Sequence, residues 1–302
     1  MLLLLLVAPT APSSLSAAAQ QEAPTAAAPA TQAPAESDTA PRIRPPQAGY
    51  RFPDGQTWMY SIEWRIFPAG VATLRTDAAG HERRVTASAD STGAAALLYR
   101  VRDRFESFFD PQTFCSHHIA KRIEEGLRRL ETSIRFDSAR HKAVLEEQNL
   151  RSGQSKVTEH EIPGCVTDVL SALYYLRTLP LEPGAVFMFP LNDGSRTVDV
   201  TVRVEAREEV RTTAGTFTTV RVRPEASEGT LHNRGQIWIW YSDDERRIPV
   251  QMRARLFFGT LTFRLERIEV EAMGGRERSR GPHPRRFLRV MGWRSGSPPP
   301  KS

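Results

Sequence analysis

The feature that most constrains the fold is the pattern of residues 235–252. Ile237, Ile239 and Tyr241 alternate there with Trp238 and Trp240. Successive side chains of an extended strand point to opposite faces, so both faces of this strand carry large apolar groups and need cover. Residues 242–247 are all polar or charged, as in a solvated turn, and an apolar run resumes at residues 248–250. The segment therefore predicts a β-hairpin with both faces buried.

Alternating apolar and polar residues recur along most of the chain. The clearest examples are residues 58–66 and the valines of residues 198–204. Further strands are predicted over residues 71–77, 83–90, 101–109, 114–123, 127–136, 143–148 and 261–270, with apolar segments at 185–190 and 217–222. Residues 67–70 contain Pro and Gly and predict a turn. Along the last strand, apolar residues shift from odd to even positions, and this shift predicts a β-bulge near Glu266.

Residues 167–178 form the one convincing helical segment. Thr167 and Asp168 are natural N-cap residues, apolar residues then recur on one face, and Pro180 forbids continuation. We interpret Asp168 and Ser171 as cap and first-turn residues. A short Ala/Leu segment at residues 92–99 predicts one or two further helical turns. The pattern predicts a mainly β fold: a single antiparallel β-barrel or strongly curled sheet over about residues 49–274, with the short helix packed across an opening.

Both ends of the chain differ in composition from this central part. Residues 1–19 combine an apolar, leucine-rich run with small residues that fit a cleavage site, and predict a secretory signal peptide. Residues 20–48 are an Ala/Pro-rich linker predicted to be disordered. No later apolar run approaches the ~20 residues that a membrane-spanning helix needs. We therefore expect an exported protein of the periplasm or cell envelope.

The basic charge of the chain is concentrated in residues 275–302, which we predict to be a disordered tail. This tail contains eight Arg or Lys and one Glu, a net charge of +7, whereas the whole chain carries +6. The rest of the chain is close to neutral, so it has no electrostatic footprint for nucleic acid. The tail's arginines and apolar residues are compatible with contact to an anionic membrane or glycan surface, or with a solvated tail that contacts nothing.

Five segments together resemble a known family. They are residues 67–72 (FPAGVA), 168–177 (DxxSxxYYxR), 181–184 (LxPG), 214–217 (AGTF) and 239–250 (IWxSDDxRRIPV). In order and spacing these segments are similar to the domain-of-unknown-function 3108 family. The resemblance implies an exported bacterial cell-envelope protein with a β-rich, barrel-like fold and no established activity. It supplies no catalytic residues and no cofactor.

The two cysteines, Cys115 and Cys165, permit one disulfide. In an exported protein a disulfide between them is a natural expectation, because the compartment is oxidising. Two buried free thiols are the alternative, since spacing alone does not show that their Cα atoms approach each other.

Two clusters of polar residues suggest metal binding but favour a simpler interpretation. His117 and His118 follow Cys115 closely, yet neighbouring residues of a strand point to opposite faces and do not readily bind one ion. The acidic residues 243–245 are followed at once by Arg246 and Arg247, so local charge pairing in the turn accounts for them. We predict no metal site, and no catalytic residue is predicted because no nucleophile elbow or phosphate loop is present.

Aromatic residues are the candidates for lining an apolar cavity inside the barrel, although most such residues are plain core. The candidates are Trp58, Trp64, Tyr174, Trp238 and Trp240. The first function hypothesis is a non-enzymatic module that binds a lipid-like amphiphile, a glycan or an envelope protein. The alternatives are a structural or assembly protein with a filled core, and an envelope hydrolase that uses a carboxylate pair.

Overall fold

The computed structural model describes residues 42–47, 50–226 and 235–271. The predicted signal peptide, the predicted basic tail and most of the predicted linker lie outside the described residues. Residues 42–47 correct the linker prediction, because they contact the folded part. The Arg42 amide donates to the Met188 carbonyl (3.1 Å), the Arg44 amide donates to the Tyr175 hydroxyl (3.0 Å), and Ile43 packs against the core.

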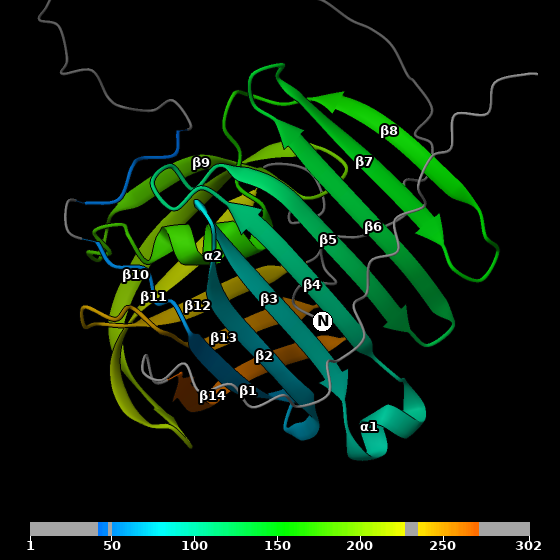
Figure 1. Cartoon of the computed structure of the whole chain (residues 1–302). Helices are drawn as coiled ribbons and strands as arrows, with labels where there is room; N and C mark the ends of the chain where they lie inside the picture. The colour runs from blue at the N-terminus through cyan, green and yellow to red at the C-terminus, as the bar shows by residue number, and fades with distance from the viewer. Residues whose placement is uncertain (1–41, 48–49, 227–234, 272–302) are drawn as a thin grey trace, which may run out of the picture. The chain divides into compact units, whose positions relative to one another are not determined.

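Fourteen strands form one antiparallel sheet (Figure 1). They are β1 (Gln56–Trp64), β2 (Phe67–Ala79), β3 (Glu82–Ser91), β4 (Arg102–Phe109), β5 (Ser116–Glu125), β6 (Arg128–Asp137), β7 (Lys142–Asn149), β8 (Ser155–Glu161), β9 (Val186–Asn192), β10 (Thr197–Thr212), β11 (Gly215–Ala226), β12 (Gln236–Ser242), β13 (Pro249–Leu256) and β14 (Gly259–Val270). Two helices interrupt them, α1 (Gly93–Leu98) and α2 (Val169–Leu176). No helix in the described ranges has the length and apolar character needed to cross a membrane.

The sheet curls strongly without closing. Strands that are neighbours in sequence pair with each other, except β8 and β9, which are the two edges. Strand β1 also pairs with β14. These edges approach each other at one corner, where Nε2 of His160 in β8 lies 2.9 Å from the side-chain nitrogen Nδ2 of Asn192 in β9. The connection between the two edge strands contains α2, which lies in the concavity of the sheet (Figure 1). The predicted mainly β fold is confirmed, in its open and curled form.

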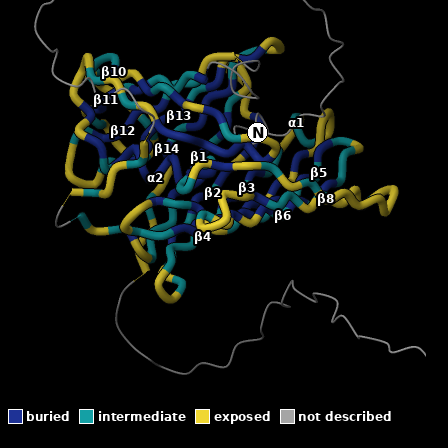
Figure 2. Tube along the Cα trace, turned by 90° about the horizontal axis from the view of Figure 1, so that it is seen from above, coloured by how far each residue is buried: buried dark blue, intermediate teal, exposed yellow. Residues whose placement is uncertain are grey.

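The inward side chains of the strands and of α2 form the main core. Strand alternation follows the predicted pattern, with buried residues in the middle of the strands and exposed ones at the turns (Figure 2). In β12, Ile239 and Tyr241 enter this core, whereas Trp240 lies on the outer face against Val210 and Val250. The predicted hairpin of β12 and β13 is thus covered on both faces.

The predicted turn at residues 67–70 is wrong, because these residues begin β2. The chain turns instead at Arg65 and Ile66, where Arg65 adopts a positive φ of 58°. Pro68 is tolerated in the strand because the β1–β2 register shifts beside it, as expected for proline at a bulge. Gly70 is needed for packing, since a Cβ at this position would lie 2.2 Å from the Asp90 carbonyl oxygen of β3.

Two further details separate what the pattern predicts well from what it does not. The predicted bulge is confirmed, because β1 residues Met59 and Tyr60 pair with Arg267 and Leu265 and leave Glu266 unpaired. Strand β8 was not predicted. It is an edge strand with no buried residue, so it lacks the apolar alternation that marks the other strands.

Cys115 and Cys165 form a disulfide. The bond joins the segment before β5 to the segment before α2 and closes a loop of 50 residues. It therefore restrains the approach to α2 from the side of β5. The cysteines are not free thiols.

Removing this disulfide is expected to lower stability mainly by loosening the unfolded chain. For a loop of this length, the Cys115→Ala/Cys165→Ala variant is expected to lose about 4 kcal/mol of unfolding free energy. Urea denaturation of the oxidised protein and the double variant measures the difference. A reducing agent should destabilise the wild type and leave the variant unchanged, and a loss below ~1 kcal/mol would contradict the loop-entropy account.

Candidate functional site

Helix α2 begins at a capping box built by Asp168 and Ser171. The Asp168 carboxylate accepts from the Leu170 amide (2.7 Å) and the Ser171 amide (3.2 Å), and the Ser171 hydroxyl accepts from the Asp168 amide (2.9 Å). Both residues are fully or almost fully buried. The predicted cap is present, and it lies inside the molecule rather than at its surface.

The same carboxylate also binds the sheet. Its second oxygen accepts from the hydroxyls of Ser107 in β4 (2.6 Å) and Ser116 in β5 (2.7 Å). Lys121 of β5 is also buried, donates to the Asp193 carbonyl (3.3 Å) and faces the carboxylates of Asp168 and Asp193. Burial lowers the pKa of Lys121, and the two carboxylates oppose that shift. The start of α2 is therefore fixed to β4 and β5 by a buried polar network.

The other end of α2 is fixed to the opposite part of the sheet. The Tyr241 hydroxyl of β12 donates to the Leu173 carbonyl (2.8 Å), and the Arg177 guanidinium donates to the carbonyls of Arg246 (Nη2) and Arg247 (2.9 Å) in the β12–β13 turn. Burial raises the pKa of Tyr241 well above its usual range, so its hydroxyl remains a neutral donor. Two segments that carry the family resemblance, residues 168–177 and 239–250, thus contact each other directly.

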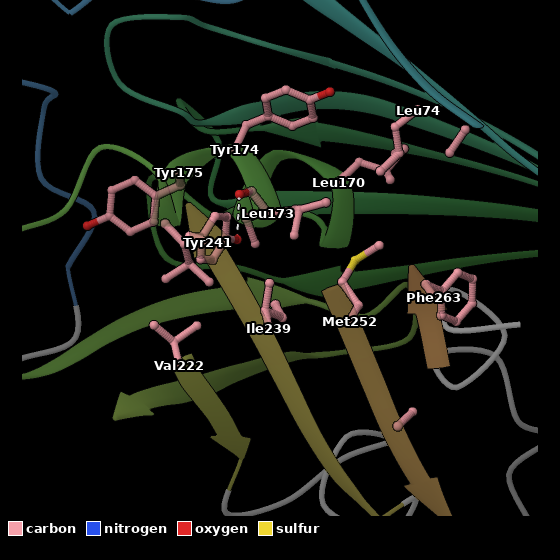
Figure 3. Packing of buried hydrophobic residues seen from close by; sticks show 14 of the residues in the cluster. Leu74, Leu170, Leu173, Tyr174, Tyr175, Val222, Ile239, Tyr241, Met252 and Phe263 are labelled. Atoms are coloured by element: carbon pink, nitrogen blue, oxygen red, sulfur yellow. Dashed lines mark hydrogen bonds between the residues drawn. The ribbon is translucent and has the colours of Figure 1, made fainter. Parts of the chain in front are cut away.

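Between α2 and the inner face of the sheet lies a cavity of about 130 Å³. Figure 3 shows Leu170 and Leu173 of the helix facing Ile239, Met252 and Phe263 of the sheet. The lining is almost wholly apolar, and its aliphatic and aromatic members include Leu74, Val169, Leu170, Leu173, Leu176, Phe189, Leu191, Val200, Ile237, Ile239, Met252 and Phe263. Tyr60 is the one ionisable side chain in the lining, and its hydroxyl already donates to the Pro249 carbonyl (2.9 Å).

Small residues leave this space open. Ala72 of β2 and Ala89 of β3 are paired across the sheet, Ala87 lies beside Leu74, and all three alanines line the cavity. They face the leucines of α2. Interiors normally pack to high density, so three short side chains opposite a helix leave volume that a leucine at any of these positions would fill.

None of the five predicted aromatic residues lines the cavity, which corrects that prediction. Trp58 and Tyr174 are buried and stack on each other (5.3 Å between ring centroids), and the Arg177 guanidinium lies over the Trp58 ring. These residues are therefore core. The other three candidates do not reach the interior either.

Trp238 and Trp240 lie on the outer face of the sheet, and Trp64 lies at the end of β1. Trp64 sits 39% exposed at the β1–β2 turn. Trp240 packs in the outer cluster with Trp238, and its indole nitrogen donates to Glu208 (2.6 Å). The sequence pattern correctly placed the tryptophans and isoleucines of β12 on opposite faces. The prediction assigned the cavity lining to the tryptophan face, but the isoleucines on the other face line the cavity.

The other polar clusters of the sequence are occupied by local partners. His117 contacts Glu82, and His118 hydrogen-bonds Ser133 (3.0 Å) on the other face of the strand. In the β12–β13 turn, Asp243 pairs with Arg247 (2.9 Å), and Asp244 likewise pairs with Arg246. Within the described ranges no three metal-ligating side chains gather in one place.

The sequence pattern does not predict a second buried ionisable pair, Asp103 and Glu125. Asp103 of β4 and Glu125 of β5 are buried close to each other. Burial, together with the neighbouring Asp103 carboxylate, raises the pKa of Glu125 to about 8. Asp103 also accepts from the Glu124 amide (3.2 Å). The pair does not line the cavity, and no periodic signal distinguishes it from the other alternating polar residues of these strands.

Comparison with known proteins places this geometry in a family. The model of the family described as "Protein of unknown function (DUF3108)" matches residues 59–266, which includes all of α2 and every cavity-lining residue. The chain belongs to the DUF3108 family. No curated protein matches the chain.

Solved structures are similar to this DUF3108 chain at low sequence identity. The β-barrel-like DUF1849 protein from Brucella abortus is 9% identical, with a TM-score of 0.52 over 76% of this chain and 99% of that one. A candidate exported protein with a YmcC-like fold from Bacteroides fragilis is 10% identical, with a TM-score of 0.33 over 76% of this chain and 100% of that one. A candidate lipoprotein from Parabacteroides distasonis is 11% identical, with a TM-score of 0.32 and the same coverage. The first of these supports the fold alone.

The anchoring of α2 in the DUF3108 domain can be tested at Asp168. Replacing Asp168 by alanine leaves two helix amides and two serine hydroxyls without their acceptor, so Asp168→Ala is expected to lose roughly 3 kcal/mol of unfolding free energy. Asp168→Asn keeps one capping oxygen and should lose less. Chemical denaturation measures both losses, and equal losses for the two variants would contradict the proposed anchoring.

The Asp103–Glu125 pair predicts a pH dependence of stability. Because the folded state binds the Glu125 proton more tightly than the unfolded state does, the unfolding free energy should fall as pH rises from about 4.5 to 8, by at most ~1.4 kcal/mol per pH unit. Glu125→Gln removes this titration, so its stability relative to wild type should improve with rising pH. Denaturation midpoints at pH 5, 6.5 and 8 give the comparison, and parallel profiles would refute the shift.

Proposed function

We propose that this DUF3108 protein is an exported, non-enzymatic binding module of the bacterial cell envelope. Its ligand group is apolar and is buried between α2 and the sheet. The observation that carries the proposal is the set of alanines at positions 72, 87 and 89, which leaves a space of about 130 Å³ open beneath α2.

The size and lining of the cavity limit the ligand. Apolar cavities of about 150 Å³ stay dry and accept a benzene-sized guest, whereas pockets for drug-sized ligands span about 300–1,000 Å³. The cavity therefore suits a short alkyl segment, such as the end of an acyl chain, rather than a whole lipid. An apolar lining leaves the hydroxyls of a sugar without partners, so the acyl chain is favoured over the glycan.

Two features support export to an oxidising compartment. The N-terminal sequence has the apolar run and small residues of a signal peptide. The disulfide between Cys115 and Cys165 is of a kind that persists in secreted and periplasmic proteins and is rare in the cytosol. Together they favour the periplasm or envelope as the place of action.

A hydrolase is a weaker candidate. Catalytic groups are expected to converge in a cleft where a substrate can reach them. The buried Asp168 is engaged in holding α2, the buried Lys121 donates to the Asp193 carbonyl, and the Asp103–Glu125 pair lies outside the cavity lining. A binding or structural role fits the chemistry of the interior better.

Filling the cavity tests the proposal. The protein would be purified from a bacterial periplasm and titrated with fatty acids of increasing chain length, with thermal stability and native mass spectrometry as readouts. We expect fatty acids to raise the melting temperature of the wild type and to remain bound in the mass spectrum. In Ala87→Leu the added side chain occupies the cavity, so the shift should be lost.

Thr86→Leu is the matched control, because residue 86 adjoins Ala87 in β3 but lies on the other face of the strand. It should bind as the wild type does. Equal binding by wild type and Ala87→Leu, or no binding by the wild type at any chain length, would overturn the proposal in favour of a structural role.

A further inference from the structure

Large apolar side chains are exposed at one end of the sheet. Phe257 is 99% exposed, Leu97 90% and Ile66 81%, although soluble surfaces rarely gather such residues in one region. We define the apolar rim as Ile66, Phe67, Leu97, Leu98, Leu127 and Phe257, each at least 60% exposed.

The topology requires these residues to lie at the same end. In an antiparallel sheet the alternate connections share an end, and the rim residues belong to the connections β1–β2, β3–β4, β5–β6 and β13–β14. Figure 1 places α1, which carries Leu97 and Leu98, beyond the ends of the strands that it joins. The rim is thus formed by neighbouring tips and not by one long flat face.

Contacts link these tips into a continuous series. The Arg65 amide donates to the Thr260 carbonyl (2.6 Å), which joins the β1–β2 and β13–β14 turns. The Thr92 amide donates to the Ala69 carbonyl (3.1 Å) and joins α1 to β2. The Gly126 amide donates to the Arg100 carbonyl (2.8 Å), which joins the β5–β6 turn to the segment after α1. These backbone hydrogen bonds hold the turns of the apolar rim next to one another.

The turns that carry the apolar rim contain basic residues and no acidic ones. The connecting residues 65–66, 92–101, 126–127 and 257–258, together with the adjacent β7–β8 turn at 150–154, contain three basic residues and no Asp or Glu. The basic residues are Arg65, Arg100 and Arg151. Arg65 lies over the Trp64 ring, and Arg151 donates to the Leu127 carbonyl (3.0 Å). Arginines therefore stand among the apolar tips.

The opposite end of the sheet has a different character. Its described connections include residues 80–81, 138–141 and 243–248, which contain Asp, Glu, Arg and His. None of the exposed large hydrophobic residues of the described chain lies in these connections. The apolar rim is thus specific to one end and does not reflect a general property of the turns.

We propose that the apolar rim docks this protein on an anionic phospholipid membrane surface. Apolar side chains on separate protruding tips can each enter the interfacial layer of a bilayer, while arginines between them meet lipid phosphates. This combination of projecting apolar tips and arginines in the same turns fits a lipid surface better than a protein groove, which would need a continuous complementary face.

Vesicle sedimentation of the full chain tests the proposal. We expect the wild type to bind vesicles of phosphatidylglycerol and phosphatidylcholine more strongly than vesicles of phosphatidylcholine alone. The double variant Ile66→Ser/Phe257→Ser should bind the anionic vesicles at least about tenfold more weakly, because two inserted side chains are lost. Both side chains lie in solvent, so the variant is expected to fold, which thermal unfolding verifies.

The control variant is Val186→Ser/Val270→Ser, which changes two exposed apolar residues of β9 and β14 at the opposite end. It should bind as the wild type does. A rim variant that binds as tightly as the control would overturn the proposal, as would equal weakening of both.

Trp64 offers a second, local readout. It lies beside the rim, so vesicles with brominated acyl chains should quench the fluorescence of the wild type more than that of Trp64→Phe. Equal fractional quenching of the two proteins would place the rim outside the bilayer and reject docking by this end. The comparison isolates the rim because every other tryptophan is present in both proteins.

Discussion

The Asp168 carboxylate is the interaction on which the interior of this protein depends. A curled sheet that does not close leaves its inner face uncovered along the concavity, and α2 supplies the cover. A helix of eight residues is too short to be stable alone, so its position must come from tertiary contacts. Asp168 provides them at one end, by capping α2 and accepting from Ser107 and Ser116, while Arg177 holds the other end to the β12–β13 turn.

Fixing α2 at both ends explains how a cavity persists beneath it. If the helix could shift, it would settle against the alanines of β2 and β3 and remove the space. The polar contacts of Asp168 oppose that movement, because a shifted helix would leave the buried carboxylate and its serine hydroxyl donors without hydrogen-bond partners. The cavity therefore depends on two features. The hydrogen bonds at its ends hold α2 in place, and Ala72, Ala87 and Ala89 have side chains too short to fill the space beneath it.

The sequence predicted the fold much better than the site. Period-two alternation located most strands and even the bulge at Glu266, because burial on one face imposes that pattern. It failed for β8, which buries nothing, and at residues 67–70, where Pro and Gly serve a bulge and a close strand contact. The cavity could not be predicted, because its signal is the smallness of a few alanines whose partners lie across the fold. The predicted aromatic residues Trp58 and Tyr174 pack in the core instead of lining the cavity.

The cavity and the apolar rim are related through the same topology. The lining residues Ala72, Ala89 and Ile237 lie near the strand ends that lead to the connections of the rim end: β2 begins at Phe67, β3 ends at Ser91 and β12 begins at Gln236. An antiparallel sheet sorts its turns into two sets. Here the rim residues and their arginines belong to turns of one set, whereas the turns at 138–141 and 243–247 of the other set carry Arg, His, Asp and Glu. Because these three lining residues lie toward the rim end, an acyl chain leaving a bilayer at the rim would approach the cavity from their side.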